Sequence, residues 1–455
     1  MREAWQENLA AILGAANVCI EPGERHQSVW DEISPRAVAC PADREQLCEL
    51  MRLADAERLK VVPVGHGTKL RMGGASPPID FAISLERLNQ VSDYPASDLT
   101  ISVEAGLPIH LLESTLAAKG QMLPLDVPFA KYATVGGTIA ANVNGPRRLA
   151  YGSWRDIVLG VQYVTAEGKL AKGGGKVVKN VAGYDTPKLM IGSMGTLGVM
   201  VEVTFKAFPV PPATATLMLR FRSAQQAAQA ALRIVHSQLV PQALDLIDSP
   251  AYGSPADQPW LQAPGTLLAR LAGAEEVLAR YERELPALVR ADGLESFEIF
   301  RGDRETELWR TVREMTPAFL RRHPNGVIVK AALPFTRMGE FIELIERARA
   351  SSEKHGIADA ILARAGSGIV YAHLWSIFPE KSEAHAAGLA AASNALISAA
   401  EQRGGRAIVE WCPSELKNKV NLWGTLGDDF TSMRSLKAAL DPNLILSPGR
   451  FYGGI

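Results

Sequence analysis

Cysteine is scarce in this chain of 455 residues, which contains only Cys19, Cys40, Cys48 and Cys412. None of these cysteines belongs to a C-x-x-C pair, so the sequence supports neither a zinc ribbon nor an iron–sulfur cluster held by this chain. Four scattered thiols in a large chain fit a reducing compartment, where they pack as small core residues. We therefore expect a cytoplasmic protein without disulfide bonds.

The chain also lacks a charge surplus and a long apolar run. The net charge is −1, which gives no indication of binding to nucleic acid or to an anionic membrane. No run of 18 apolar residues is present, so we expect no transmembrane helix. Glu3 and Glu7 interrupt the start of the chain, which predicts an amphipathic helix rather than a signal peptide.

The remaining composition is ordinary for a soluble globular protein, with 47% hydrophobic and 21% charged residues. The length predicts two or three domains, and no fixed-period repeat is visible. Both strands and amphipathic helices are expected along the chain. Helices over residues 41–59 and 111–119 come first, and helices alternate with strands beyond the proline-rich break at residues 208–213.

Residues 173–205 hold the densest run of glycine, with Gly192, Gly195 and Gly198 following the triplet at 173–175 and Gly183. Glycine allows another backbone or a ligand to approach closely. Here the glycines lie among Val, Ile, Leu and Met, which predicts a buried stretch followed by a strand from Val199. The stretch is either a wall of a cofactor site or a buried turn with many close contacts.

The first glycine-rich turn along the chain, residues 65–70, follows the apolar strand at residues 61–64. Its sequence is Gly65-His66-Gly67-Thr68-Lys69-Leu70. Successive backbone N–H groups in such a turn can form a nest that binds an anion such as pyrophosphate. The alternative is a simple tight turn, and the Rossmann pattern G-x-G-x-x-G is not present.

The second glycine turn along the chain lies at residues 134–142 and reads TVGGTIAAN. The small side chains after the glycines would let a flat ligand lie against the main chain. Residues 151–156, YGSWRD, then precede a strand expected over residues 157–165, which ends in a hairpin turn at Glu167-Gly168. Each of the three glycine-rich stretches could thus form a wall that holds an anion or another ligand.

Six segments in this order resemble the FAD-binding flavoproteins of the PCMH type, also called the vanillyl-alcohol-oxidase type: PVGHGTKL, ATVGGTIAAN, YGSWRDIVLG, KNVAGYD, GSMGTLGVMVEV and DPNLILSPGRF. Within that fold the chain is most similar to the FAD-binding subunits of bacterial glycolate oxidase, and its motifs look like those of the smaller subunit, GlcE. Met194 stands where the larger subunit usually has a glutamate.

The resemblance implies an α+β fold, with a two-subdomain FAD-binding domain and an α/β cap domain with a mainly antiparallel sheet. The implied limits are an N-terminal helical lead over residues 1–34, the FAD domain over 35–209, the cap over 210–430 and a return to the FAD domain over 431–455. The implied FAD-binding residues are Val64, Gly65, His66, Gly67, Thr68, Lys69, Leu70, Thr134, Gly136, Gly137, Thr138, Ala140, Asn144, Asp156, Gly195, Thr196, Gly198 and Val199.

Some members of this fold attach FAD covalently through a histidine that follows the last glycine of the first turn. Thr68 occupies that position here, so we expect non-covalent FAD. His66 lies inside the turn, where we favour a histidine satisfied by backbone contacts.

The cap is expected to carry the substrate chemistry. Catalytic relatives use two histidines and an aspartate in one glycine-framed stretch and a later histidine, which hold a metal and take a proton. A loose alignment puts Arg364, Ser367 and Tyr371 in the first stretch and Trp411 in the second. We therefore expect no metal, with Arg364, Tyr371 and Glu410 as candidate catalytic residues. A salt bridge for Arg364 and a structural role for Glu410 are the alternatives.

Three functions remain open on these grounds. The first is the FAD subunit of a glycolate-oxidase-like dehydrogenase for a small 2-hydroxy acid, glycolate or D-lactate. The others are a non-catalytic assembly or electron-relay subunit, and a stand-alone FAD oxidoreductase for another alcohol. The resemblance implies a homologous flavin subunit and a separate iron–sulfur subunit as partners, through which the protein would associate with a membrane.

Overall fold

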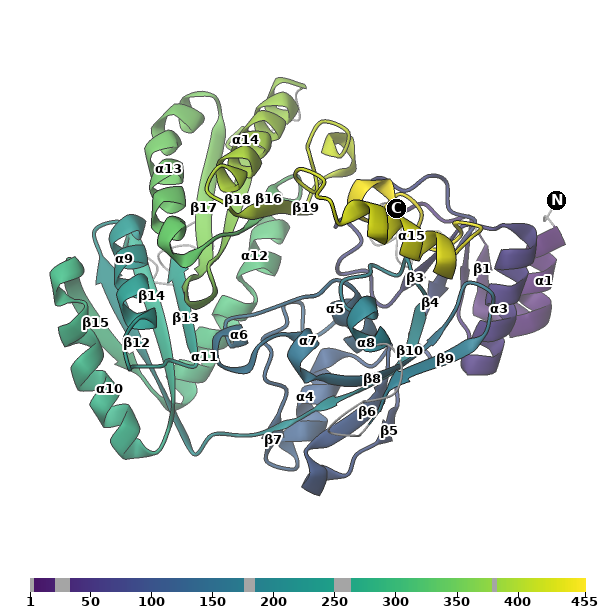
Figure 1. Ribbon diagram of the computed structural model, residues 1–455, viewed down its shortest axis with the longest axis horizontal. Coiled ribbons are helices and arrows are strands. Elements are labelled where there is room, and N and C mark those ends of the chain that lie inside the picture. Colours follow the sequence, from purple (N-terminus) through teal and green to yellow (C-terminus); the bar gives the residue numbers. More distant parts are fainter. Residues whose placement is uncertain (1–3, 21–32, 176–184, 249–262, 379–382) are drawn as a thin grey trace. The chain divides into compact units, whose positions relative to one another are not determined.

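The computed structural model describes residues 4–20, 33–175, 185–248, 263–378 and 383–455. Contacts divide the chain into two compact units (Figure 1). Unit 1 contains Met1–Asn144, Gly152–Val210 and Leu426–Ile455, and unit 2 contains Gly145–Tyr151 and Pro211–Thr425. The domain limits expected from the sequence stay a proposal.

Unit 1 contains two main sheets and a set of mostly short helices. The strands are β1 (Val18–Ile20), β2 (Ala37–Ala39), β3 (Val61–Val64), β4 (Phe81–Ser84), β5 (Val91–Asp93), β6 (Thr100–Glu104), β7 (Gln121–Met122), β8 (Val158–Val164), β9 (Leu170–Gly174), β10 (Val199–Lys206) and β11 (Phe208–Pro209). The helices are α1 (Ala4–Leu13), α3 (Arg44–Glu57), α4 (Ile109–Ala117), α5 (Val135–Ala140), α7 (Trp154–Ile157), α8 (Thr186–Met190) and α15 (Phe430–Leu440).

The smaller sheet of unit 1 has the order β1-β2-β4-β3, and β4 runs parallel to both β2 and β3. Strands that run parallel in one sheet need a crossover connection, and α3 supplies the one that leads from β2 to β3, on the two sides of β4. Asp43 starts this helix, because its side chain accepts a hydrogen bond from the Gln46 backbone N–H at 2.8 Å. The strand β3 then ends where the first glycine-rich turn begins, which fixes the direction from which that turn enters its site.

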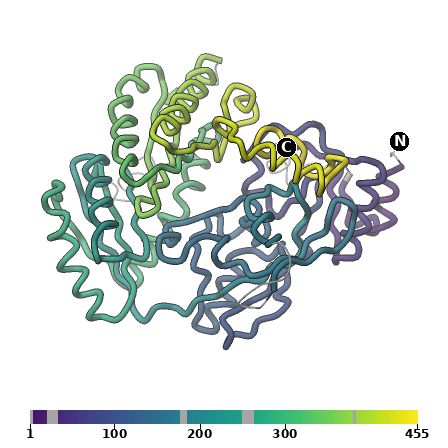
Figure 2. Tube along the Cα trace, viewed as in Figure 1, coloured from purple at the N-terminus to yellow at the C-terminus, as the bar shows by residue number. Residues whose placement is uncertain are grey.

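The larger sheet of unit 1 is antiparallel, with the order β5-β6-β10-β8-β9. Its core includes Trp154 of α7, which is fully buried and packs edge-on against Phe205 with ring centroids 5.8 Å apart. The predicted hairpin at Glu167-Gly168 joins β8 to β9, which pair directly. The end of the chain returns to this unit, and Figure 2 shows it beside the N-terminal part.

Unit 2 is built around one sheet. Its strands are β12 (Ala213–Phe221), β13 (Ala243–Ile247), β14 (Gly265–Gly273), β15 (Leu294–Phe300), β16 (Val327–Ala332), β17 (Ile357–Arg364), β18 (Ile369–Ser376) and β19 (Arg406–Trp411). Its helices are α6 (Arg148–Tyr151), α9 (Ala224–Val235), α10 (Glu275–Leu288), α11 (Gly302–Arg313), α12 (Met315–Arg322), α13 (Phe335–Lys354) and α14 (Glu383–Glu401).

The topology of unit 2 repeats although the sequence shows no period. The strand order is β15-β12-β14-β13-β17-β18-β16-β19, and every pairing is antiparallel. Each half follows the path strand–helix–strand–strand–helix–strand, and the halves meet where Leu246 and Ile247 of β13 pair with β17. A repeat of this kind needs only the same pattern of buried positions, so the two halves do not need similar residues.

The two faces of this sheet differ. Alternate residues such as Val329, Ala331 and Ala363 belong to the apolar core under α9, α13 and α14. The intervening residues therefore point to the opposite face, which α11 and α12 cover. On this second face the Trp309 indole of α11 donates to the Thr216 hydroxyl at 2.8 Å. The polar residues of the strands thus gather on one side of the sheet.

Candidate active site

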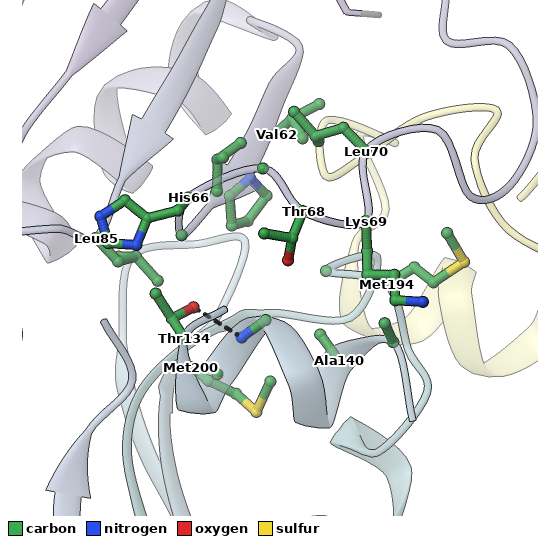
Figure 3. A pocket seen from close by; sticks show the side chains of 18 of the residues that line it. Val62, His66, Thr68, Lys69, Leu70, Leu85, Thr134, Ala140, Met194 and Met200 are labelled. Atoms are coloured by element: carbon green, nitrogen blue, oxygen red, sulfur yellow. Dashed lines mark hydrogen bonds between the residues drawn. The ribbon is translucent and has the colours of Figure 1, made fainter. Parts of the chain in front are cut away.

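One pocket in unit 1 brings the three glycine-rich stretches together (Figure 3). It encloses about 750 Å³, counting its open mouth. Its walls are residues 62–70 of the first turn, residues 134–141 at α5, and residues 194–200, with Leu85 and Arg450 completing the lining. The residues that line it include the cations Lys69 and Arg450 and no carboxylate, which suits an anionic ligand.

The first turn is held against the segment that precedes α5. His66 donates from Nδ1 to the Tyr132 carbonyl oxygen at 2.7 Å, which agrees with a histidine satisfied by backbone. Gly65 must be glycine, because a Cβ atom there would lie 2.1 Å from Thr134 Oγ1. The close approach of these two walls leaves the remaining backbone of the turn facing the pocket.

The second wall is a short helix rather than the glycine turn that the sequence predicts. Thr134 caps α5, because its Oγ1 accepts a hydrogen bond from the Gly137 N–H at 3.3 Å. Figure 3 shows Thr134 and Ala140 on this helix, opposite the loop that carries Thr68 and Lys69. The sequence predicts a turn because glycine is a poor helix former. The Thr134 cap and the buried packing of Val135 and Ile139 nevertheless stabilise a helix here.

Most of the expected cofactor-binding residues line this pocket, namely Val64, Gly65, His66, Gly67, Thr68, Lys69, Leu70, Thr134, Gly136, Gly137, Ala140, Gly195 and Gly198. Others lie behind the walls or apart from them. The hydroxyls of Thr138 and Thr196 donate to carbonyl oxygens of their own segments, and Asn144 does the same with its amide. Val199 is fully buried, and exposed Asp156 caps α7 through Ser153. These roles stay predictions. KNVAGYD and Gly183 fall largely outside the described residues.

A second group of polar residues lies on the α11–α12 face of the sheet in unit 2. Arg364 of β17 pairs with the fully buried Asp245 of β13. Its guanidinium carbon also lies 5.7 Å from the centre of the Tyr371 ring. The structure therefore contains the salt bridge that was the alternative role for Arg364, while bringing it next to a second candidate.

Lys330 of β16 joins these residues to the third candidate, Glu410 of β19. Its ammonium lies 3.4 Å from a Glu410 carboxylate oxygen and 5.6 Å from the centre of the Tyr371 ring. Lys330 and Tyr371 are direct cross-strand partners. Arg364, Tyr371 and Glu410, all at least nine-tenths buried, are thus brought together around Lys330, and we call these four residues the Lys330 cluster.

The surroundings favour a protonated lysine and a neutral phenol in this cluster. Burial alone would lower the pKa of Lys330, but the Tyr371 oxygen and the Glu410 carboxylate raise its pKa above the usual range. Burial is also the main reason why the pKa of Tyr371 is raised. Close by on β18, burial lowers the pKa of His373 to about 3, so this imidazole is neutral. It lies 3.4 Å from the Thr316 hydroxyl and packs edge-on against Phe319.

Sequence reasoning missed Lys330, Asp245 and Arg450. Lys330 and Asp245 each stand alone within an apolar strand, where a charged residue is rarely buried without a partner. That pattern could have identified both residues as parts of a buried polar group. Arg450 lies in the closing turn, about 380 residues from the first glycine turn, and only the fold brings it to the pocket.

The family to which the chain belongs follows from sequence comparison. A family described as "FAD binding domain" matches residues 35–174. A second, described as "FAD linked oxidases, C-terminal domain", matches residues 210–451, which is more than half of the chain. The chain belongs to the FAD-linked oxidases.

Relatives of this FAD-linked oxidase include glycolate oxidase subunit GlcD of Bacillus subtilis, which is 27% identical over 92% of this chain and 89% of its own length. D-2-hydroxyglutarate dehydrogenase of Xanthomonas citri is 30% identical, with the same shares of the two chains covered. Glycolate oxidase subunit GlcE of Escherichia coli is 37% identical, but over 38% of this chain and 49% of its own length. The prediction of an FAD-dependent oxidoreductase is confirmed.

Solved structures confirm the predicted fold. p-Cresol methylhydroxylase aligns with a TM-score of 0.78 over 98% of this chain and 97% of its own, at 16% identity. Alkyldihydroxyacetonephosphate synthase aligns with a TM-score of 0.75 over 99% and 86%, at 17% identity. At such identities the likeness establishes the PCMH-type architecture, with its antiparallel cap sheet, and nothing about substrate.

The pocket of unit 1 fits the cofactor of this FAD-linked oxidase. FAD is long, partly flat and carries a pyrophosphate, and the pocket offers a backbone turn, small side chains along α5 and two cations. Within the described ranges no helix has the length and apolar character needed to cross a membrane. Those ranges also show no group of three or more His, Cys, Asp or Glu side chains placed to hold a metal ion.

Proposed function

We propose that this FAD-linked oxidase oxidises a small 2-hydroxy acid, glycolate or D-lactate, and passes the electrons to a partner. The relatives support the substrate class, because their names include glycolate oxidase, D-2-hydroxyglutarate dehydrogenase and D-lactate dehydrogenase. The observation that carries the proposal is the Lys330 cluster, which combines two cations, a phenol and a carboxylate on one sheet face.

Two members of the cluster, Lys330 and Glu410, suit the two functional groups of a 2-hydroxy acid. The Lys330 ammonium can donate charge-assisted hydrogen bonds to the substrate carboxylate. The Glu410 carboxylate can accept the proton of the substrate hydroxyl as the carbon is oxidised. Asp245 offsets much of the Arg364 charge, so Arg364 would orient Tyr371 and add positive potential rather than bind the carboxylate alone.

When bound, FAD supplies the redox chemistry by accepting the two electrons that leave the substrate carbon. The residues of unit 1 bind and orient it. The first turn and Lys69 would hold the pyrophosphate, and α5 and residues 194–200 would exclude water from its flat part. Thr68 at the attachment position supports non-covalent binding.

The second candidate is an electron-relay or assembly subunit, in which a homologous flavin subunit performs the oxidation. The Arg364–Asp245 ion pair favours it, because a guanidinium already paired with a buried carboxylate is a weaker binder of substrate. Both functions predict a homologous flavin subunit and an iron–sulfur subunit that co-purify with the chain. A stand-alone oxidase for another alcohol would be recovered without them.

Anaerobic mixing of the purified chain with glycolate and with D-lactate tests the proposal. Catalysis predicts that the visible absorbance of the flavin bleaches without any partner. Bound flavin that stays oxidised with both acids would overturn intrinsic catalysis and support the relay function. L-lactate serves as a control for non-specific reduction.

A further inference from the structure

The end of the chain belongs to unit 1, and a set of buried contacts joins it to the FAD pocket. We call residues 437–450 the C-terminal brace. The Val61 N–H donates to the Ile445 carbonyl at 2.8 Å, and the Ser447 N–H donates back to the Val61 carbonyl at 2.8 Å. Leu446 thereby forms a parallel bridge with Val61 at the edge of β3, the strand that leads into the first turn.

Lys437 attaches the brace to the third wall of the pocket. Its ammonium donates to the Thr196 carbonyl and to the Leu446 carbonyl, each at 2.8 Å, and to the Asp441 carboxylate at 2.6 Å. Lys437 is 3% exposed and Asp441 is fully buried. Asp441 also accepts the backbone N–H groups of Ile445 and Leu446. A buried charge with this many partners resists displacement, because removing one partner leaves the others unsatisfied.

Arg450 attaches the brace to the first turn. One guanidinium nitrogen donates to the carbonyls of Leu70 and Met72, both at 3.0 Å. The Gly74 N–H donates to the Arg450 carbonyl at 2.9 Å, so the contact is reciprocal. Arg450 is 4% exposed, yet it lines the pocket. Its charge and its hydrogen bonds therefore act on the segment that receives the anionic part of the ligand.

We propose that Arg450 is a positioning residue for FAD and that docking of the C-terminal brace is coupled to FAD binding. By fixing the carbonyls of Leu70 and Met72, Arg450 holds the end of the first turn so that its backbone N–H groups converge on the pyrophosphate. Its charge adds a favourable potential for the same anion. Docking of the brace and binding of FAD then stabilise each other, because coupling between two binding events is reciprocal.

Arg450→Met tests the positioning role, because it keeps an unbranched apolar stem like that of arginine and removes the charge and the hydrogen bonds. The probe is FAD itself, and the readout is the rise in flavin fluorescence as FAD leaves the diluted holoprotein. Loss of charged hydrogen bonds predicts release about 10- to 100-fold faster than in the wild type. The rate of FAD release from Arg450→Lys should lie between the rates of the wild type and Arg450→Met, because lysine keeps the charge but not the planar set of donors of arginine.

Arg434→Met is the matched control. Arg434 is an exposed cation of α15, just before the brace, and its guanidinium carbon lies 6.0 Å from the centre of the Phe430 ring. We expect it to release FAD at the wild-type rate. A purely structural role for Arg450 predicts lower thermal stability without faster FAD release at a temperature where the variant is folded. FAD release from folded Arg450→Met at the wild-type rate would overturn the proposal.

Limited proteolysis of the wild-type protein decides the question if Arg450→Met does not fold. Reciprocal coupling predicts that added FAD slows cleavage within the C-terminal brace, while cleavage of α14 in unit 2 is unchanged. Equal cleavage of the brace with and without FAD would refute the coupling. Neither readout involves a hydroxy acid, so failure of the chain to oxidise glycolate would leave this inference standing.

Discussion

Replacement of Gly195 by glutamate should abolish FAD binding while leaving the protein folded. Gly195 is buried, lines the pocket and has a backbone φ of +74°. A Cβ atom there would lie 3.1 Å from Ser447 Oγ and 3.3 Å from Pro63 Cδ. These contacts are tight but not prohibitive, so the cost of the substitution comes mainly from the backbone and from the carboxylate.

The two costs differ in size and in what they affect. A non-glycine residue in the left-handed region costs about 1–2 kcal/mol, which reduces the stability of the fold. A buried, unpaired carboxylate costs several kcal/mol more. It can avoid that cost only by occupying the pocket, where it also repels the pyrophosphate. A loss of about 4 kcal/mol in FAD affinity corresponds to roughly a thousandfold weaker binding.

Three variants separate these effects. Gly195→Ala carries mainly the backbone cost, so we expect it to melt at a lower temperature while retaining FAD. Gly120→Glu is the matched control, because Gly120 has a φ of +67° in the same unit and a Cβ atom there meets nothing within 4 Å. The measurements are the ratio of visible flavin absorbance to protein and the thermal melting curve. Folded Gly195→Glu with normal flavin content would show that Gly195 does not face the cofactor.

Three further predictions concern attachment, chemistry and pH. Because Thr68 stands at the attachment position, acid precipitation should leave the flavin in the supernatant, and flavin on the denatured chain would contradict non-covalent binding. Lys330→Met should lower hydroxy-acid turnover at least a hundredfold with normal flavin content, whereas the exposed control Lys354→Met should not. Turnover by Lys330→Met equal to that of the wild type would show that Lys330 takes no part in the reaction. Burial lowers the pKa of His373 to about 3, below the value of about 6.5 in the unfolded chain. The unfolded chain therefore binds the proton first, and stability present above pH 6.5 is lost as the pH falls. Denaturant unfolding should show a loss of about 3 kcal/mol by pH 4 that His373→Gln lacks and His110→Gln retains. Parallel pH profiles of wild type and His373→Gln would refute this.

The sequence by itself indicated most of the segments that line the candidate cofactor pocket, because each of these segments has a recognisable local pattern. Glycine runs among apolar residues, such as that around Gly195, indicate close backbone approach, and the resemblance of six segments in one order implied the fold. The strand at 61–64 and the helix over 41–59 were predictable for the same reason, since their hydrophobic periodicity and the Asp43 cap lie within one short stretch. What these segments bind was implied by resemblance, and the convergence of their walls was not visible in any of them.

Only the tertiary structure decided which charged residues share a site. Lys330 and Glu410 are 80 residues apart in the chain, and pairing of β16 with β19 brings them together. Arg450 reaches the first glycine turn from about 380 residues away. The physical reason is that a buried charge is stabilised by whichever partner the sheet places opposite it. Sequence pattern shows that such a residue needs a partner, and strand order and register determine which partner it has.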